Sequence, residues 1–183
     1  WISTMQHNAG IVKVVSALSS LLKNMAKGFN EKVTVRQELD FLDNYITIEK
    51  IRYIELFDVE ISVDEPSLYD ARIIKLTLQP LVENSIFSGI EPSGKPGLIQ
   101  IHIFSKEQVL YISIRDNGVG ISEENIARML TDTSRVAKNY MSGIGLPNVD
   151  RRIKLVYGPE YGLEIDSKVG LYTCVTVSIP LEI

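Results

Sequence analysis

The hydrophobic periodicity of this 183-residue chain changes at residue 57. Before that point, apolar residues recur at three- and four-residue steps, which predicts amphipathic helices over residues 11–27 and 34–54. From Phe57 to Val63 apolar residues alternate with polar ones, as in a half-buried strand. We therefore place a domain boundary near residue 55 and expect strands to dominate after it.

The later elements complete an α/β pattern. Thr34 and Gln37 form a T-x-x-Q capping box at the start of the second helix. Beyond residue 63 we predict a helix within 76–90 that tolerates Pro80 in its first turn, followed by strands at 98–105 and 108–115 joined by Lys106-Glu107. A short helix near 123–130 and a polar lid that reaches residue 142 come next. A helix at 147–157 and strands at 162–168 and 171–179 complete the chain. The expected fold class is an α/β sandwich, one mixed sheet with helices on one face, preceded by an α-helical segment.

Bulk composition excludes several classes of protein. The net charge of −4 does not suit a nucleic-acid binder, and no apolar run reaches the roughly 18 residues of a membrane span. Cys174 is the single cysteine, so no internal disulfide can form. Because the chain begins at Trp1, we expect it to be a piece of a longer protein.

Glu83 and Asn84 place an acid beside an amide on the predicted helix 76–90. An asparagine carbonyl oxygen suits Mg²⁺, which usually keeps several waters and takes phosphate oxygens as further ligands. A neighbouring carboxylate can polarise a water. Taken alone, the pair is more often a solvated helix face.

The sequence Asp116-Asn117-Gly118-Val119-Gly120 follows the second predicted strand of the hairpin. Glycines at alternate positions let the backbone approach a ligand closely. Asp116 at the strand end can accept a hydrogen bond from an exocyclic amine such as that of adenine. Taken alone, these residues more often form a plain turn.

A second glycine turn, Gly143-Ile144-Gly145-Leu146, leads directly into the helix 147–157. Backbone N–H groups and the helix dipole at such a position can hold an anion. Neither a Walker A motif nor G-x-G-x-x-G is present. Together the three segments supply a metal ligand, an adenine acceptor and a phosphate cradle, with a lid between the last two.

These segments resemble the boxes of the Bergerat-fold ATPases, the superfamily of gyrase, MutL and the histidine kinases. L-Q-P-L-V-E-N is similar to the N box, D-N-G-V-G to the first glycine box and G-I-G-L to the second. Within this superfamily, the sequence is most similar to the LytS/YesM-like sensor histidine kinases. The similarity lies in the segment G-I-G-L-P-N-V-D-R-R-I, the helix V-R-Q-E-L-D-F-L-D-N-Y-I-T-I-E-K-I-R-Y and the closing strand V-T-V-S-I-P. The resemblance covers essentially the whole chain.

The resemblance implies binding of ATP and Mg²⁺, then transfer of the γ-phosphoryl group to a histidine and onward to an aspartate of a response regulator. It implies that Asn84 is the Mg²⁺ ligand, that Asp116 contacts the adenine amino group and that Thr173 lies near the base. The remaining implied ATP-binding residues lie in the glycine boxes: Gly118, Gly120, Gly143, Gly145 and Leu146. Residues 1–55 are implied to be a partial dimerisation and phosphotransfer region, and residues 56–183 the catalytic ATP-binding domain.

Three departures from the family pattern qualify these implications. The acceptor segment N-P-H-F-L-x-N is expected upstream of this chain, so His7 and His102 are interpreted as packing or solvated residues. Phe87-Ser88 stands where Lys-His is usual, which predicts weaker phosphate binding if the basic pair holds phosphates. Pro80 occupies the position of the catalytic glutamate of many superfamily members, which leaves Glu83 as the nearby candidate base.

Two alternatives remain open at this point. One is a degenerate domain that acts as an interaction or dimerisation module, and the other is an anti-sigma serine kinase of the same fold. Under the main interpretation the full-length protein is a homodimer that does not bind nucleic acid. This part then lies in the cytoplasm, and segments outside the chain connect it to the cell membrane.

Overall fold

A computed structural model describes residues 15–16, 19, 31–131 and 145–183. The helices are α2 (Val35–Arg52), α3 (Leu78–Asn84), α4 (Glu123–Thr131) and α5 (Gly145–Tyr157), with helical turns at Pro66–Asp70, Ser85–Ile90 and Glu91–Ser93. The strands are β1 (Lys32–Thr34), β2 (Phe57–Val63), β3 (Arg72–Ile74), β4 (Gly97–Lys106), β5 (Val109–Asp116), β6 (Gly162–Lys168) and β7 (Tyr172–Pro180). Most of the predicted helix 11–27 and the lid residues from 132 onward lie outside the described residues. In the ranges above, no helix combines the length and apolar character that crossing a membrane requires.

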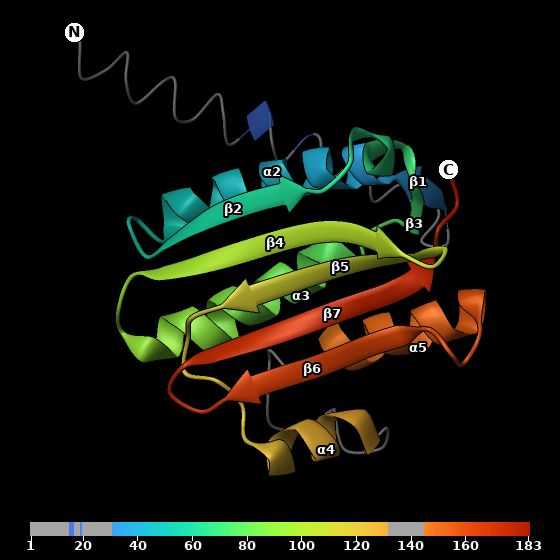
Figure 1. Cartoon of the computed structure of the whole chain (residues 1–183). Helices are drawn as coiled ribbons and strands as arrows, with labels where there is room; N and C mark the ends of the chain where they lie inside the picture. The colour runs from blue at the N-terminus through green and yellow to red at the C-terminus, as the bar shows by residue number, and fades with distance from the viewer. Residues whose placement is uncertain (1–14, 17–18, 20–30, 132–144) are drawn as a thin grey trace, which may run out of the picture.

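Five strands form one mixed sheet in the order β2-β4-β5-β7-β6 (Figure 1). β2 runs parallel to β4, and the other neighbouring pairs are antiparallel. The predicted hairpin is β4-β5, but its turn is Glu107-Gln108 and not Lys106-Glu107. Both turn residues have positive φ, 50° and 63°, as the favoured two-residue hairpin turns require. Neither residue is the glycine or asparagine that usually marks such a turn, so the sequence did not locate it.

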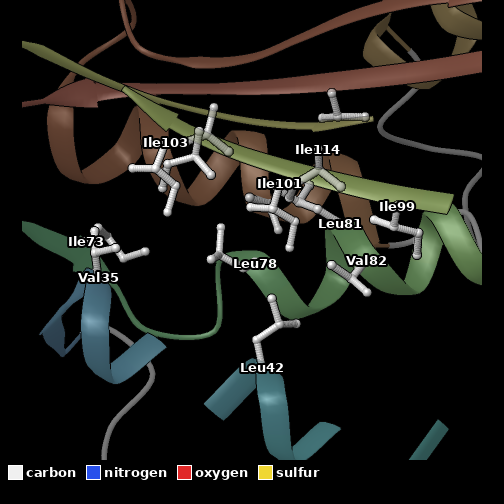
Figure 2. Packing of buried hydrophobic residues seen from close by; sticks show 14 of the residues in the cluster. Val35, Leu42, Ile73, Leu78, Leu81, Val82, Ile99, Ile101, Ile103 and Ile114 are labelled. Carbon is white, nitrogen blue, oxygen red and sulfur yellow. The ribbon is translucent and has the colours of Figure 1, made fainter. Parts of the chain in front are cut away.

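The core lies between the sheet and the helices on one of its faces. Leu78, Leu81 and Val82 of α3 are fully buried. Figure 2 shows these side chains between the isoleucines of β4 and β5 and Leu42 of α2. The predicted α/β class with helices covering one face of a mixed sheet is therefore confirmed.

Helix α2 shares this core with the sheet. Tyr45 and Ile46 are each 7% exposed and belong to the same buried cluster. Its N-terminus carries the predicted capping box: the Thr34 hydroxyl accepts from the Gln37 N–H, and the Gln37 side chain accepts from the Thr34 N–H. β1 immediately before it pairs with β3, so α2 is also fastened by backbone hydrogen bonds.

Helix α5 begins two residues before its predicted start and ends where predicted, whereas α3 ends at Asn84 and the rest of the predicted helix is the π-helical turn Ser85–Ile90. Pro80 occupies the first turn of α3, and Gly158, with φ of 114°, follows the end of α5. Of the residues that mark the apolar side of α5, Leu146, Val149 and Ile153 are buried. Val156, which has the same spacing, is 40% exposed, because it lies at the margin of the apolar stripe.

Candidate functional site

Asn84 is the last residue of α3 and is 6% exposed. Among the described residues, its side-chain amide has no hydrogen-bond partner. Pro80 lies one turn earlier on the same side of the helix, and a Cβ built on Gly145 would lie 3.3 Å from the Cβ of Pro80. The side of α3 that carries Asn84 therefore faces the N-terminus of α5.

Glu83 faces a different neighbour. Its Oε1 accepts a hydrogen bond from Gln79 Nε2 at 2.9 Å. Burial raises the pKa of the Tyr45 hydroxyl on α2, and the negative charge of Glu83 raises it further. Glu83 thus lies on the α2 side of α3, while Asn84 faces α5, and this orientation separates the predicted base from the predicted metal ligand.

Asp116 ends β5 and is 1% exposed. Its Oδ1 accepts a hydrogen bond from the Gly118 N–H at 3.0 Å, which closes the predicted turn. Burial raises the pKa of the Asp116 carboxyl, although the Gly118 N–H, the Ser85 hydroxyl and the Thr173 backbone all favour its charged form. A buried carboxylate with these partners is an oriented hydrogen-bond acceptor.

The glycine turn after Asp116 packs against the helical turn that continues α3. A Cβ on Gly118 would collide with the backbone of Gly89, and a Cβ on Gly89 would lie 2.6 Å from Asp116 Oδ1. The Val119 N–H donates to the Gly89 carbonyl at 2.9 Å. The structure therefore requires these glycines for close contact between chain segments, in addition to any approach to a ligand.

Gly120, at the other end of the same turn, packs closely against the backbone at Lys168. It has φ of 69°, and a Cβ there would collide with the Lys168 carbonyl. The Gly170 N–H donates to the Val119 carbonyl at 2.7 Å. The turn is thus held between the end of α3 and the β6–β7 connection.

Thr173 lies opposite Asp116 in the pairing of β5 with β7 and is 2% exposed. Its Oγ1 is 3.2 Å from Ser167 Oγ, which also accepts from the Ile121 N–H at 2.8 Å. The structure therefore brings Asp116, Thr173 and the first glycine box together, as the family resemblance implies. Sequence reasoning missed Ser85, Gly89 and Ser167, because only the fold carries them to this strand end.

The second glycine box starts α5. Gly145 lies beside Pro80, and Leu146 is 3% exposed and packs into the core. Gly143 lies outside the described residues, so its predicted position beside phosphates stays a prediction. The N-terminus of α5 nonetheless faces the side of α3 on which Asn84 lies.

The predicted magnesium chemistry fits a site that uses one protein oxygen. In the described part of the chain, no group of three or more histidine, cysteine, aspartate or glutamate side chains is suitably placed to hold a metal ion. The side-chain amide of Asn84 would supply one oxygen ligand on the side of α3 that faces the N-terminus of α5. A Mg²⁺ ion bound there would need further ligands from water and phosphate, which this ion commonly uses.

Phe87, which departs from the family pattern, and His102 both have packing roles. The Phe87 ring contacts Tyr53 edge-to-face with centroids 5.9 Å apart, and Arg52 lies 5.8 Å from its centroid. Phe87 thus packs against the C-terminal end of α2. His102 bonds Asp64 at 2.7 Å and stacks on Phe104, in agreement with a structural role, while His7 lies outside the described residues.

Comparison with known proteins identifies the family. Residues 69–183 match the family model of the histidine kinase-, DNA gyrase B-, and HSP90-like ATPases, and residues 1–57 match the model of the histidine kinases. The sensor histidine kinase YesM of Bacillus subtilis is 33% identical over 180 residues, which cover 98% of this chain and 29% of YesM. The sensor histidine kinase YpdA of Escherichia coli is 36% identical over 131 residues, and the sensor protein LytS of Bacillus anthracis 26% identical over 151 residues.

Solved structures agree on the fold. The catalytic domain of the histidine kinase ThkA aligns with a TM-score of 0.59 at 20% identity and covers 82% of this chain and 95% of that domain. The Acinetobacter baumannii histidine kinase AdeS also aligns with a TM-score of 0.59, at 15% identity, and covers 100% of this chain and 82% of AdeS. The chain spans 29%, 22% and 25% of the lengths of YesM, YpdA and LytS. This chain therefore belongs to the histidine kinase-, DNA gyrase B- and HSP90-like ATPase family, and within it to the sensor histidine kinases related to YesM and LytS.

Proposed function

We propose that this chain is the ATP-binding catalytic part of a two-component sensor histidine kinase. It binds ATP with Mg²⁺ and transfers the γ-phosphoryl group to a histidine that lies on a segment outside this chain. The phosphoryl group then passes to an aspartate of a response regulator. Residues 1–55 serve as part of the dimerisation and phosphotransfer region, and residues 56–183 as the catalytic domain.

The observation that carries this proposal is the environment of Asp116. A buried carboxylate held by the Gly118 N–H, with Thr173 opposite it, is suited to accept a hydrogen bond from the adenine amino group. It sits at one end of a site whose other end is formed by Asn84 and the N-terminus of α5.

The chemistry needs few reactive side chains. When bound, Mg²⁺ neutralises charge on the phosphates, and phosphoryl transfer then depends mainly on positioning. Asn84 would hold the ion through its amide oxygen, and the backbone N–H groups at the start of α5 would orient the phosphates. Glu83 remains the candidate base, and its position on the α2 side of α3 means that it acts only if a substrate approaches from there.

The proposed architecture of the full-length protein follows from its relatives. YesM and LytS are named as sensor proteins, and this chain is less than a third of the length of either. We infer a homodimer whose sensing segments lie beyond this chain, with this part in the cytoplasm and membrane attachment through those other segments.

A titration tests the proposal. A fluorescent ATP analogue is added to the chain with and without Mg²⁺, and ATP and GTP are compared as competitors. We expect saturable binding that Mg²⁺ strengthens and that ATP displaces better than GTP. Absence of binding at millimolar nucleotide would overturn the proposal in favour of an interaction module that has lost nucleotide binding.

A further inference from the structure

Helix α3, which carries Asn84, has no N-terminal cap of its own. Thr77 at its N-cap position makes no side-chain cap, because its hydroxyl donates to the Ile74 carbonyl at 2.6 Å. The first turn of α3 contains no acidic residue. The backbone N–H groups at its start therefore need a partner from elsewhere in the chain.

Glu38 of α2 supplies that partner from almost forty residues away in sequence. Its Oε1 accepts from the Thr77 N–H at 2.7 Å and from the Leu78 N–H at 3.0 Å, and its Oε2 accepts from the Leu76 N–H at 2.9 Å. Glu38 is 1% exposed. One carboxylate thus satisfies three successive backbone donors inside the protein.

Arg152 of α5 holds the same junction from the other side. Its guanidinium donates to the Leu76 carbonyl at 2.7 Å and to Thr77 Oγ1 at 3.2 Å. Leu76 itself has φ of 57°, a left-handed conformation that a leucine rarely adopts. Opposite charges on Glu38 and Arg152 attract across this junction, and burial lowers the pKa of the Arg152 guanidinium while Glu38 raises it.

Two contacts set how α5 lies along α3. Arg152 contacts the start of α3. Gly145, two turns earlier on α5, lies beside Pro80 in the first turn of α3. Asn84 lies one further turn along α3 from Pro80. A shift at the Glu38–Arg152 junction therefore moves Asn84 relative to the N-terminus of α5, whereas Asp116 and Thr173 are held by the sheet.

We propose that Glu38 is a positioning residue through which α2 sets the phosphate end of the nucleotide site. This inference rests on the proposed function. α2 lies in the part of the chain that matches the histidine kinase model, and α3 and α5 lie in the part that matches the ATPase model. Glu38 is thus a direct connection between the two, and displacement of α2 alters phosphate binding without altering adenine binding.

The test compares Glu38→Gln with the unchanged chain. The amide keeps the size of the side chain but replaces one acceptor oxygen with a donor that faces backbone N–H groups. In the free protein we expect faster hydrogen exchange at the amides of residues 76–78. The dissociation constant for ATP with Mg²⁺ should rise about tenfold, as expected for loss of a helix cap, while that for adenosine stays within about twofold.

Thr34→Ala is the matched control, because it removes the cap of α2 and leaves the start of α3 intact. It should lower stability without changing the ratio of the two dissociation constants. Arg152→Gln should, like Glu38→Gln, raise the dissociation constant for ATP and leave that for adenosine nearly unchanged. It replaces Glu38→Gln in the test if that variant does not fold. The double variant should lose no more ATP affinity than the weaker-binding single variant, because both act on one junction.

Two results separate the inference from the proposed function. If the unchanged chain binds neither ATP nor adenosine, both are overturned. If it binds both ligands and the Glu38 and Arg152 variants weaken them equally or not at all, the positioning role alone is overturned.

Discussion

At the scale of single residues, the site depends on polar groups kept inside the protein at a cost in stability. Asp116 carries its charge at a position where burial opposes ionisation. Buried polar groups of this kind destabilise the free protein unless they are satisfied. A ligand that donates a hydrogen bond to Asp116 would offset part of this cost.

Asp116→Asn should separate binding from stability. The variant removes the charged acceptor that we propose for the adenine amino group, so the dissociation constant for ATP should rise roughly tenfold or more. Burial raises the pKa of Asp116 in the folded protein, so the folded state binds the proton more tightly than the unfolded state does. The ionised carboxylate therefore costs stability at neutral pH, and this cost disappears as the pH falls through the folded-state pKa.

The free Asp116→Asn protein should accordingly be more stable than the original at pH 7, by a margin that shrinks on acidification. Urea unfolding at several pH values and calorimetric titration with ATP measure the two effects. Asp64→Asn is the control, since Asp64 is an exposed carboxylate paired with His102. Unchanged ATP affinity in Asp116→Asn would contradict the assigned role.

Asn84→Ala should remove the effect of Mg²⁺ on ATP binding. Without the amide oxygen, the dissociation constant measured with Mg²⁺ should rise roughly tenfold, toward the value measured without it. Parallel titrations with Mg²⁺ and with a chelator make the comparison. Gln79→Ala, on the α2 side of the same helix, should keep the full Mg²⁺ effect, and a variant of Asn84 that also keeps it would exclude Asn84 as the ligand.

At the scale of elements, the site is assembled from the ends of helices and strands. α3 ends at Asn84 and continues as the wider π-helical turn Ser85–Ile90. Irregular turns of this kind are frequent at functional sites. Here the turn carries Ser85 and Gly89 over the end of β5, where both contact Asp116.

Phe87→Lys introduces the basic residue that the family pattern described above has at this position. Because Phe87 packs on Tyr53 beside Arg52, a lysine loses the ring contact and meets a like charge. The free energy of unfolding should fall by about 1–2 kcal/mol. ATP affinity should not change, because the side chain points toward α2, and a gain in affinity would instead show that Phe87 weakens phosphate binding. Phe87→Leu controls for loss of the ring alone.

Elements with strong local signals were predictable, and those defined by distant partners were not. The alternation from Phe57 to Val63 and the capping box of Thr34 and Gln37 each specify structure within a few residues. β1 and β3 are three residues long, too short for any periodicity, and form only by pairing with each other. Likewise, nothing near Glu38 in sequence indicates that it caps a helix that begins at Leu78. Asp116 was found because it ends a strand and begins a glycine turn.

At the scale of the whole molecule, α2 belongs to the same folding unit as the sheet. Leu42, Tyr45 and Ile46 lie in the core cluster that includes α3 and the strands. The division that we propose near residue 55 is therefore one of function and not of folding.

A truncation tests this statement. Residues 56–183 alone would expose the apolar side of α3 and leave its N-terminus without Glu38. We expect this fragment to lack a cooperative unfolding transition, whereas residues 31–183 unfold in a single one. Thermal unfolding followed by circular dichroism and calorimetry distinguishes the two. A cooperatively folded 56–183 fragment would contradict a shared core.

The strand order also determines how molecules meet in a crowded solution. The outermost strands, β2 and β6, are each seven residues long and have no strand on their outer side in the described structure, although the Leu163 N–H of β6 donates to Asp150. Such edges invite sheets to join and aggregate. Asp58 and Glu60 lie on one edge strand, and Glu164 and Asp166 on the other. Any two copies that approach edge to edge thus bring acidic side chains together, and this repulsion protects the molecule from polymerising through its own sheet.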